Sequence, residues 1–151
     1  MGMSSGTEIR IRRSRPDELD WVNGCYSAIG FALSDAVHDV ILIAEVDGQR
    51  AGMGRLVTIE ANVMELGGIY VLEPFRRFGV AGDLVEHLIE LAGKARLYCI
   101  PFTHLAPFYE SSGFSPVTKR DPAPPKSVIE KVKWCNDHYT GGVALLWLPR
   151  N

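Results

Sequence analysis

Seven residues near the middle of the chain combine positive charge with small side chains, as a phosphate-binding turn does. The segment Arg76-Arg77-Phe78-Gly79-Val80-Ala81-Gly82 lies between an apolar run and a stretch with apolar residues at helical spacing. Small residues let a ligand approach the backbone, and the first N–H groups of a helix have no partner within it. The helix dipole and the two arginines both favour an anion there. The turn is therefore predicted to bind a phosphate group.

A strand and a helix must position this turn. Leu66–Leu72 is rich in residues that favour strands, and Val80–Ile89 carries apolar residues on one helical face. A Walker P-loop would require G-x-x-x-x-G-K-[ST], and a dinucleotide fingerprint would require G-x-G-x-x-G directly after the strand. Neither motif is present, so the turn is predicted to be an anion site of another class.

Composition limits the classes of protein that need to be considered. A chain of 151 residues suits one domain with a core, and we expect a single domain over residues 1–151 with 1–7 flexible. A hydrophobic fraction of 46% and a net charge of −2 suit a soluble protein without the basic excess of nucleic-acid-binding domains. Three widely spaced cysteines favour neither a disulfide framework nor a metal site. No stretch is typical of a signal peptide or a membrane span, so we expect a cytoplasmic protein without membrane, nucleic-acid or metal partners.

The first part of the chain is predicted to form three strands and a helix. Ser14–Asp17 offers an N-cap, an early proline and an acidic first turn for a helix that ends near Gly30. Phe31–Asp39 has no clean period and is consistent with a short helix, a loop or part of the wall of a binding site. Asp47-Gly48 is a hairpin signal. The expected strands are Glu8–Arg12, Val40–Val46 and Gln49–Thr58.

The second part predicts a parallel strand pair joined by the helix that follows the turn. The strand Val63–Val71 contains Gly67 and Gly68, which indicate a bulge or a close approach by another backbone or a ligand. The fold class is therefore α/β (α+β), with a mixed sheet of about six to seven strands flanked by helices. The remaining expected elements are helices at Gly79–Lys94, Leu105–Ser112 and Ser127–Cys135, and strands at Ala95–Ile100, Phe114–Val117 and Val143–Leu148.

Two local motifs and the order of the elements resemble one known family. The pattern R-x-x-G-x-A at Arg76, Gly79 and Ala81 resembles the acyl-coenzyme-A pyrophosphate loop of the GNAT superfamily of N-acetyltransferases. The segment Phe108-Tyr109-Glu110-Ser111-Ser112-Gly113-Phe114 resembles the F-Y-x-x-x-G-F segment of that family and lies after the same strand. The resemblance covers about Ile9–Val117.

The resemblance implies acetyl-CoA as cosubstrate and a primary amine as acceptor, with direct attack of the amine on the thioester. The strands Val63–Val71 and Ala95–Ile100 would splay apart and hold the pantetheine arm between them. Backbone contacts to the arm and thioester would come from Ile69, Tyr70 and Val71. The pyrophosphate would lie among Arg76, Arg77, Phe78, Gly79, Val80, Ala81 and Gly82.

The resemblance also implies catalytic residues. Tyr109 would be the general acid that protonates the leaving thiolate, although a core tyrosine is an alternative. Glu65 occupies a position where some members carry a general base, but a residue at a strand start is also commonly just solvated. His104, just before the helix of Tyr109, is a rival base or a capping or surface residue.

Two features depart from the family pattern. Phe102 stands where many members carry an asparagine that hydrogen-bonds the cofactor arm, which keeps a non-catalytic acyl-CoA-binding or regulatory module as an alternative. A third reading is a phosphate-binding protein for another nucleotide. The segment 121–141 is a helical insertion, and Trp134 with its neighbours gives it an apolar face that requires burial over the acceptor side or in a homodimer. The acceptor itself cannot be read from the sequence.

Overall fold

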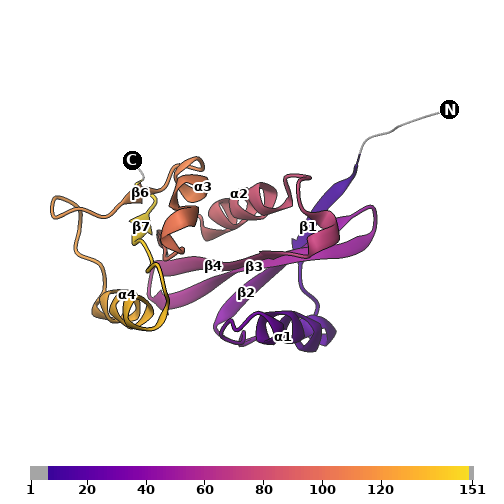
Figure 1. The fold of residues 1–151 in the computed structure, drawn as a ribbon, viewed down its shortest axis with the longest axis horizontal. Coiled ribbons are helices and arrows are strands. Elements are labelled where there is room, and N and C mark those ends of the chain that lie inside the picture. Colours follow the sequence, from indigo (N-terminus) through magenta and orange to yellow (C-terminus); the bar gives the residue numbers. More distant parts are fainter. Residues whose placement is uncertain (1–6, 150–151) are drawn as a thin grey trace. The chain divides into compact units, whose positions relative to one another are not determined.

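Seven strands form one mixed sheet in the computed structural model, which describes residues 7–149 (Figure 1). Their order is β1-β2-β3-β4-β5-β7-β6, so the expected mixed sheet flanked by helices is confirmed. The strands are β1 Ile9–Arg13, β2 Asp39–Val46, β3 Gln49–Glu60, β4 Val63–Val71, β5 Arg96–Cys99, β6 Ser115–Pro116 and β7 Leu146–Trp147. The helices are α1 Leu19–Ala28, α2 Val80–Ala92, α3 Ala106–Glu110 and α4 Lys126–His138, with 3₁₀ turns at η1 Pro16–Glu18, η2 Glu73–Phe75 and η3 Thr103–Leu105.

The chain divides into two compact units. The first unit contains the residues up to Arg55 together with Gly68–Glu90, and the second contains Leu56–Gly67 with the residues from Leu91 onward. Residues 1–7 were predicted to be flexible; residues 1–6 lie outside the described part of the chain, so this stays a prediction. Each unit has a buried apolar cluster of its own.

In the first unit, α1 and α2 lie on opposite faces of β1, β2 and β3 (Figure 1). Val22 and Tyr26 are four residues apart in α1 and fully buried against Ile41, Ile43 and Met53 of the strands. Alternate residues of a strand point to opposite faces, so the other side of β2 is free to pack elsewhere. Of the five apolar residues predicted to share one face of α2, Val80, Leu84, Val85 and Leu88 are buried and Ile89 is half-buried.

The segment between α1 and β2 is a loop rather than a second short helix. The Asn23 side chain accepts a hydrogen bond from the Ser34 backbone N–H at 2.7 Å and donates one to the Ser34 carbonyl at 3.1 Å. The Arg55 guanidinium donates to the Ser34 hydroxyl at 2.7 Å. These side-chain hydrogen bonds satisfy backbone groups that would otherwise be paired within a helix. The loop conformation agrees with the absence of a helical period in this part of the sequence.

The entry to α1 differs in detail from the expectation. Arg15, not Ser14, precedes the first turn, and its backbone N–H donates to the Glu18 carboxylate at 2.8 Å. Glu18 is 2% exposed and receives two hydrogen bonds from the Arg12 guanidinium, at 2.8 and 2.9 Å. Arg12 also donates to Glu45 at 2.9 Å. A buried carboxylate therefore fixes the start of α1 to the first two strands.

Acid is expected to destabilise the protein through Glu18. The hydrogen bonds from Arg12, opposed by burial, lower the pKa of Glu18 from 4.5 to about 2. Because the pKa of Glu18 is lower in the folded than in the unfolded protein, the carboxylate stabilises the fold at pH values above 4.5. This stabilisation is lost as the pH falls from 4.5 towards about 2. The loss is about 3 kcal/mol, since one pKa unit corresponds to about 1.4 kcal/mol. Urea unfolding at pH 7, 5 and 3 measures it. In Glu18→Gln the free energy of unfolding should be lower at pH 7 and should change less with pH; an unchanged slope would contradict the assignment.

In the second unit, β4 and β5 are parallel, as predicted from the strand–helix–strand order. All four residues of β5 pair with Val63–Leu66 of β4. From Gly67 onward β4 continues to Val71. The early end of β5 is consistent with the splayed pair that the family resemblance implies.

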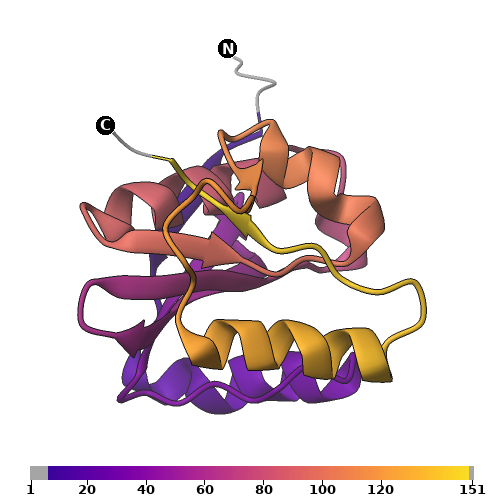
Figure 2. The same cartoon turned by 90° about the vertical axis from the view of Figure 1, so that its left-hand side faces the viewer.

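The last strands are shorter than predicted. The expected strand Val143–Leu148 is reduced to β7, with a separate bridge between Val143 and Phe102. The expected strand Phe114–Val117 is reduced to β6, which contains Pro116 and so has one backbone donor fewer. Helices α3 and α4 lie on opposite sides of β5 and β7 (Figures 1 and 2).

A side chain from α1 approaches Gly68 of β4 closely. Gly68 has a φ of +62°, and a Cβ at this position would lie 2.5 Å from the Tyr26 hydroxyl oxygen. That hydroxyl donates to the Gly68 carbonyl at 2.7 Å. The predicted close approach at Gly68 is therefore made by a side chain, and an approach by a ligand stays a prediction.

Candidate active site

The turn between β4 and α2 has the backbone geometry of an anion-binding concavity. Arg77 and Gly79 have φ values of +77° and +82°, whereas Arg76 has a φ of −70° and Phe78 is not in the positive range. Successive backbone N–H groups in a turn conformation can point to the same side and form an anion-binding concavity. Arg77 occupies the left-handed region without being a glycine, which costs about 1–3 kcal/mol and is most common at functional turns.

The first turn of α2 continues this concavity. The Asp83 N–H donates to the Gly79 carbonyl at 3.1 Å, so Gly79 is the last residue before the helix. The N–H groups of the first helical residues have no carbonyl acceptor within the helix, and they point out of its end. A Cβ added at Gly82 would meet nothing within 4 Å. Packing does not require a glycine there, and its absence of a side chain leaves the helix end open to a ligand.

The two arginines of the turn differ in their contacts. Arg76 donates from Nε to the Val71 carbonyl at 2.9 Å, and its guanidinium lies 5.9 Å from the centroid of the Tyr70 ring. A guanidinium has five N–H donors, so this bond fixes the side chain and leaves other N–H groups to bind a ligand. Arg77 is exposed. Phe78 is also 46% exposed, which is unusual for a large apolar side chain in a tight turn.

The end of β4 is anchored on the side of β3. The Leu72 N–H donates to the Ala51 carbonyl at 2.8 Å, and a Cβ at Gly52 would lie 2.6 Å from the Tyr70 carbonyl oxygen. The predicted cofactor-contact residues Ile69, Tyr70 and Val71 are half-buried in this part of β4. The ten predicted cofactor residues therefore all lie in the first unit, between Ile69 and Gly82.

The second unit contains the three predicted catalytic residues. Glu65 is buried, with 11% of its side chain exposed, and both carboxylate oxygens lie 2.8 Å from the Lys131 ammonium of α4. It is therefore not a solvated strand-start residue. Lys131 was not predicted as a site residue, although its position three residues after Val128 and four before Cys135 places it on the same helical face as those buried residues.

Tyr109 is buried in α3 with 7% of its surface exposed. Its ring packs edge-to-face with Phe108 and Phe114, at centroid separations of 4.9 and 6.3 Å. Gly113, with a φ of +107°, closes the helix so that Phe114 can fold back on Tyr109. The F-Y-x-x-x-G-F segment thus builds a rigid aromatic setting around one phenol.

His104 belongs to a chain of five aromatic rings. Its imidazole stacks on Phe102 at 6.2 Å, and Phe102 contacts Tyr139 edge-to-face at 5.3 Å. Tyr139 packs on Trp134 at 5.8 Å, which stacks on His138 at 4.1 Å. Trp134 is 51% exposed in the single chain, so its burial over the acceptor side or in a homodimer stays a prediction. Stacking on these neighbours covers one face of its ring, and the buried side of α4 consists of Val128 and Cys135 instead.

The cysteines are not arranged for nucleophilic or metal chemistry. Burial raises the pKa of Cys25, Cys99 and Cys135, so their thiols stay protonated near neutral pH. No group of three or more potential His, Cys, Asp or Glu ligands is gathered within residues 7–149. In the same range, no helix has both the length and the apolar character needed to cross a membrane.

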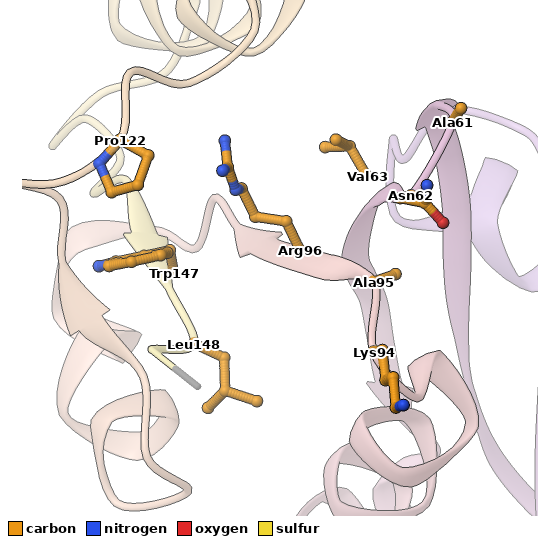
Figure 3. A pocket seen from close by; sticks show the side chains of 9 residues that line it. All are labelled: Ala61, Asn62, Val63, Lys94, Ala95, Arg96, Pro122, Trp147 and Leu148. Atoms are coloured by element: carbon orange, nitrogen blue, oxygen red, sulfur yellow. The ribbon is translucent and has the colours of Figure 1, made fainter. Parts of the chain in front are cut away.

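A cavity of about 530 Å³ lies at the beginning of β4 and β5 (Figure 3). Arg96 extends into it between Pro122 and Val63, and Trp147 lies below Pro122. The cavity contains none of the predicted site residues. Ligands of parallel strands bind beyond their carboxyl ends, so this cavity lies at the wrong end of the strand pair to be the active site.

Comparison with known proteins decides the family. A model of the acetyltransferase (GNAT) family matches residues 8–114, which is more than half of the 151 residues. The chain belongs to the GNAT acetyltransferase family. This match includes both the turn between β4 and α2 and the segment of Tyr109, and acetyl-CoA is the cosubstrate of this family. A search of curated proteins finds no match.

Solved structures agree with the GNAT fold. Rv2747 from Mycobacterium tuberculosis, solved with CoA, is 14% identical with a TM-score of 0.70 and covers 94% of this chain and 99% of its own. The ribosomal-protein-S18-alanine N-acetyltransferase from Escherichia coli is 19% identical with a TM-score of 0.67, covering 94% of each chain. N-acetylglutamate synthase from Neisseria gonorrhoeae, solved with CoA and L-arginine, is 17% identical with a TM-score of 0.67 and covers 94% of this chain. This chain spans only about a third (34%) of the length of that synthase.

Proposed function

We propose that this GNAT protein is an N-acetyltransferase that transfers the acetyl group of acetyl-CoA directly to a primary amine. The observation that supports it most is the turn from Arg76 to Gly82, where alternating φ signs, a helix start and an open position at Gly82 occur together within the family match. This combination fits a pyrophosphate, and the packing of the free protein does not require it.

The residues present fit acetyl-CoA. The N–H groups from Arg77 to Gly82 and the two arginines hold the pyrophosphate, because oriented donors and positive charge both stabilise an anion. The backbone of Ile69, Tyr70 and Val71 holds the pantetheine arm and the thioester, since β4 continues past the last residue of β5. The bound cosubstrate supplies an activated acetyl thioester.

Glu65 and Tyr109 have complementary roles in this proposal. Glu65 takes a proton from the acceptor ammonium, because only the neutral amine has a lone pair for attack. Tyr109 donates its hydroxyl proton to the sulfur as the thiolate leaves, which is costly without a donor in a partly dry site. His104 is exposed and stacked on Phe102, so we assign it to the acceptor entrance rather than to proton transfer.

The acceptor class is an amine whose remaining structure the fold does not specify. The names of the related enzymes indicate acceptors as different as an amino acid and the alanine of a ribosomal protein. We assign α4 with its aromatic chain to the acceptor side or to a homodimer contact, and the protein to the cytoplasm.

A non-catalytic acyl-CoA-binding module is the second candidate. Phe102 replaces an asparagine of many members, and its ring packs on His104 and Tyr139 instead of offering an amide to the cofactor arm. Such a module would bind acetyl-CoA and would acetylate no amine in a broad panel, whereas the proposed enzyme would acetylate at least one.

Gly82→Ala is expected to weaken acetyl-CoA binding at least tenfold without harming the fold. Its Cβ enters open space in the free protein and would crowd the pyrophosphate in the complex. Alanine also favours a helix over glycine by about 1 kcal/mol, so the variant should be as stable as wild type or more so. Isothermal calorimetry with acetyl-CoA measures the affinity, and thermal unfolding measures the stability.

Gly24→Ala is the matched control. Gly24 lies exposed within α1, and a Cβ there also meets nothing within 4 Å. The same substitution should therefore stabilise the protein to a similar extent and leave the acetyl-CoA affinity unchanged. If both variants bind acetyl-CoA like wild type, the turn is not the pyrophosphate site. If wild type does not bind acetyl-CoA at millimolar concentration, the proposed function is wrong.

A further inference from the structure

The cavity at the beginning of β4 and β5 is lined by residues of the second unit alone. Its volume of about 530 Å³ falls within the range of about 300–1,000 Å³ that is usual for small-molecule sites. Val63 pairs with Arg96 across the two strands, and the Arg96 N–H donates to the Asn62 carbonyl at 2.7 Å. Trp147 belongs to β7. Strands β4, β5 and β7 of the sheet therefore all contribute to its walls.

The charged side of the cavity is basic. Among residues 7–149, Lys94 and Arg96 are the charged residues that line it, and neither forms an ion pair within that range. Arg96 is half-buried, and its side chain extends into the cavity between Pro122 and Val63 (Figure 3). A cation that is partly removed from water without a counter-ion is unfavourable. The cavity therefore favours an anion.

The apolar side of the cavity offers a flat aromatic surface. Trp147 is half-buried and packs against the buried cluster of Val63, Tyr98 and Val128, which holds its indole in place. An indole binds another flat ring by stacking or by edge-to-face contact. The planar guanidinium of Arg96 matches the two oxygens of a carboxylate through parallel N–H···O bonds. Few other anions combine a planar charged group with a flat apolar body.

We propose that this cavity binds a small carboxylate that carries an aromatic ring. The carboxylate accepts hydrogen bonds from the Arg96 guanidinium, Lys94 adds positive charge, and the ring packs on Trp147. The bound acid stabilises the folded protein, because it binds residues that the fold brings together from separate strands. The site shares no residue with the proposed acetyl-CoA and catalytic residues, so this inference goes beyond the proposed function and does not rest on it.

Isothermal calorimetry of the full chain with cinnamate as the probe tests the binding. Cinnamamide has the same ring without the charge, and acetate has the charge without the ring. We expect cinnamate to bind in the millimolar range or more tightly, with at least tenfold higher affinity than either control compound. The inference would be overturned if cinnamate did not bind at millimolar concentration, or if either control compound bound as tightly.

Two variants test the cations of the cavity. Arg96→Gln should lower the affinity for cinnamate at least tenfold. It should keep the fold, because the guanidinium has no ion pair in the described part of the chain and the pairing with β4 is made by the backbone. Lys94→Gln, at an exposed position, should lower the affinity several-fold and provides the same test if Arg96→Gln does not fold. Wild-type affinity in either folded variant would contradict the proposed site.

Lys133→Gln is the matched control. Lys133 is exposed in α4 of the same unit and does not line the cavity. The substitution removes one positive charge from the protein, as Lys94→Gln does, and should leave the affinity for cinnamate unchanged. An equal loss of affinity in Lys133→Gln and Lys94→Gln would mean that only the net charge of the protein attracts cinnamate.

Heteronuclear NMR locates the bound probe. Cinnamate should shift the backbone N–H resonances of Asn62, Arg96 and Trp147. Shifts confined to Arg77–Gly82 would place the anion at the turn between β4 and α2 and would overturn the inference. Acetyl-CoA is titrated separately, so its binding and the binding of cinnamate can fail independently.

Discussion

Tyr109→Phe is expected to slow acetyl transfer about a hundred- to ten-thousand-fold, which is the usual contribution of a positioned general acid. The substitution removes one hydroxyl and keeps the ring that packs between Phe108 and Phe114. The fold and the acetyl-CoA affinity should therefore survive. If the hydroxyl acts only in the transition state, kcat and kcat/KM should fall together. Steady-state kinetics with any acceptor found in an amine panel measures both.

Tyr98→Phe provides the matched control for this prediction. Tyr98 in β5 is fully buried, and its hydroxyl has no hydrogen-bond partner among the described residues. Removing a buried hydroxyl without a partner should leave the rate unchanged and raise the free energy of unfolding by about 1 kcal/mol. A Tyr109→Phe enzyme within threefold of wild type would mean that Tyr109 is only a core residue.

Glu65→Gln should produce the second large loss of rate, about a hundredfold or more, with little loss of stability. Glutamine has the shape of glutamate but cannot accept the proton of an ammonium at neutral pH. The Lys131 side chain is 50% exposed, so its charge can turn towards water when the carboxylate is removed. Kinetics at saturating acetyl-CoA and chemical unfolding measure the two effects separately.

Lys131→Met should show the opposite pattern. It keeps the carboxylate of Glu65 but leaves it buried without its cation, which lowers stability. The cost is about 1–3 kcal/mol, less than for a fully buried pair because Lys131 is half exposed. If Glu65→Gln lost stability and kept its rate, Glu65 would be only the anchor of α4.

The strand pair and the turn between them could be predicted from the sequence because their signals are local. The β-prone run Val63–Val71, the glycines of the turn and the 3.6-residue period of α2 each fix backbone conformation within a few residues. The parallel pairing of β4 and β5 followed from the helix between them, since such a connection has few alternatives. The Asp47-Gly48 hairpin was predicted for the same reason, and both residues have positive φ.

The segments that were predicted less well depend on contacts distant in the sequence. Phe31–Asp39 has its conformation set by Asn23 and Arg55, which lie in other elements. The contact between Gly68 and the Tyr26 hydroxyl was not predicted, because nothing near Gly68 in the sequence indicates it. The buried side of α4 is formed by Val128 and Cys135, whereas Trp134 is 51% exposed in the single chain.

The sequence by itself determined the family and the cosubstrate, because short motifs encode the backbone of the turn and the packing around Tyr109. Only the tertiary structure paired Glu65 with Lys131, which lie 66 residues apart. It also joined Arg12, Glu18 and Glu45 into one buried network. The partner of a buried charge is decided by which elements pack together, and no local pattern of residues records that choice.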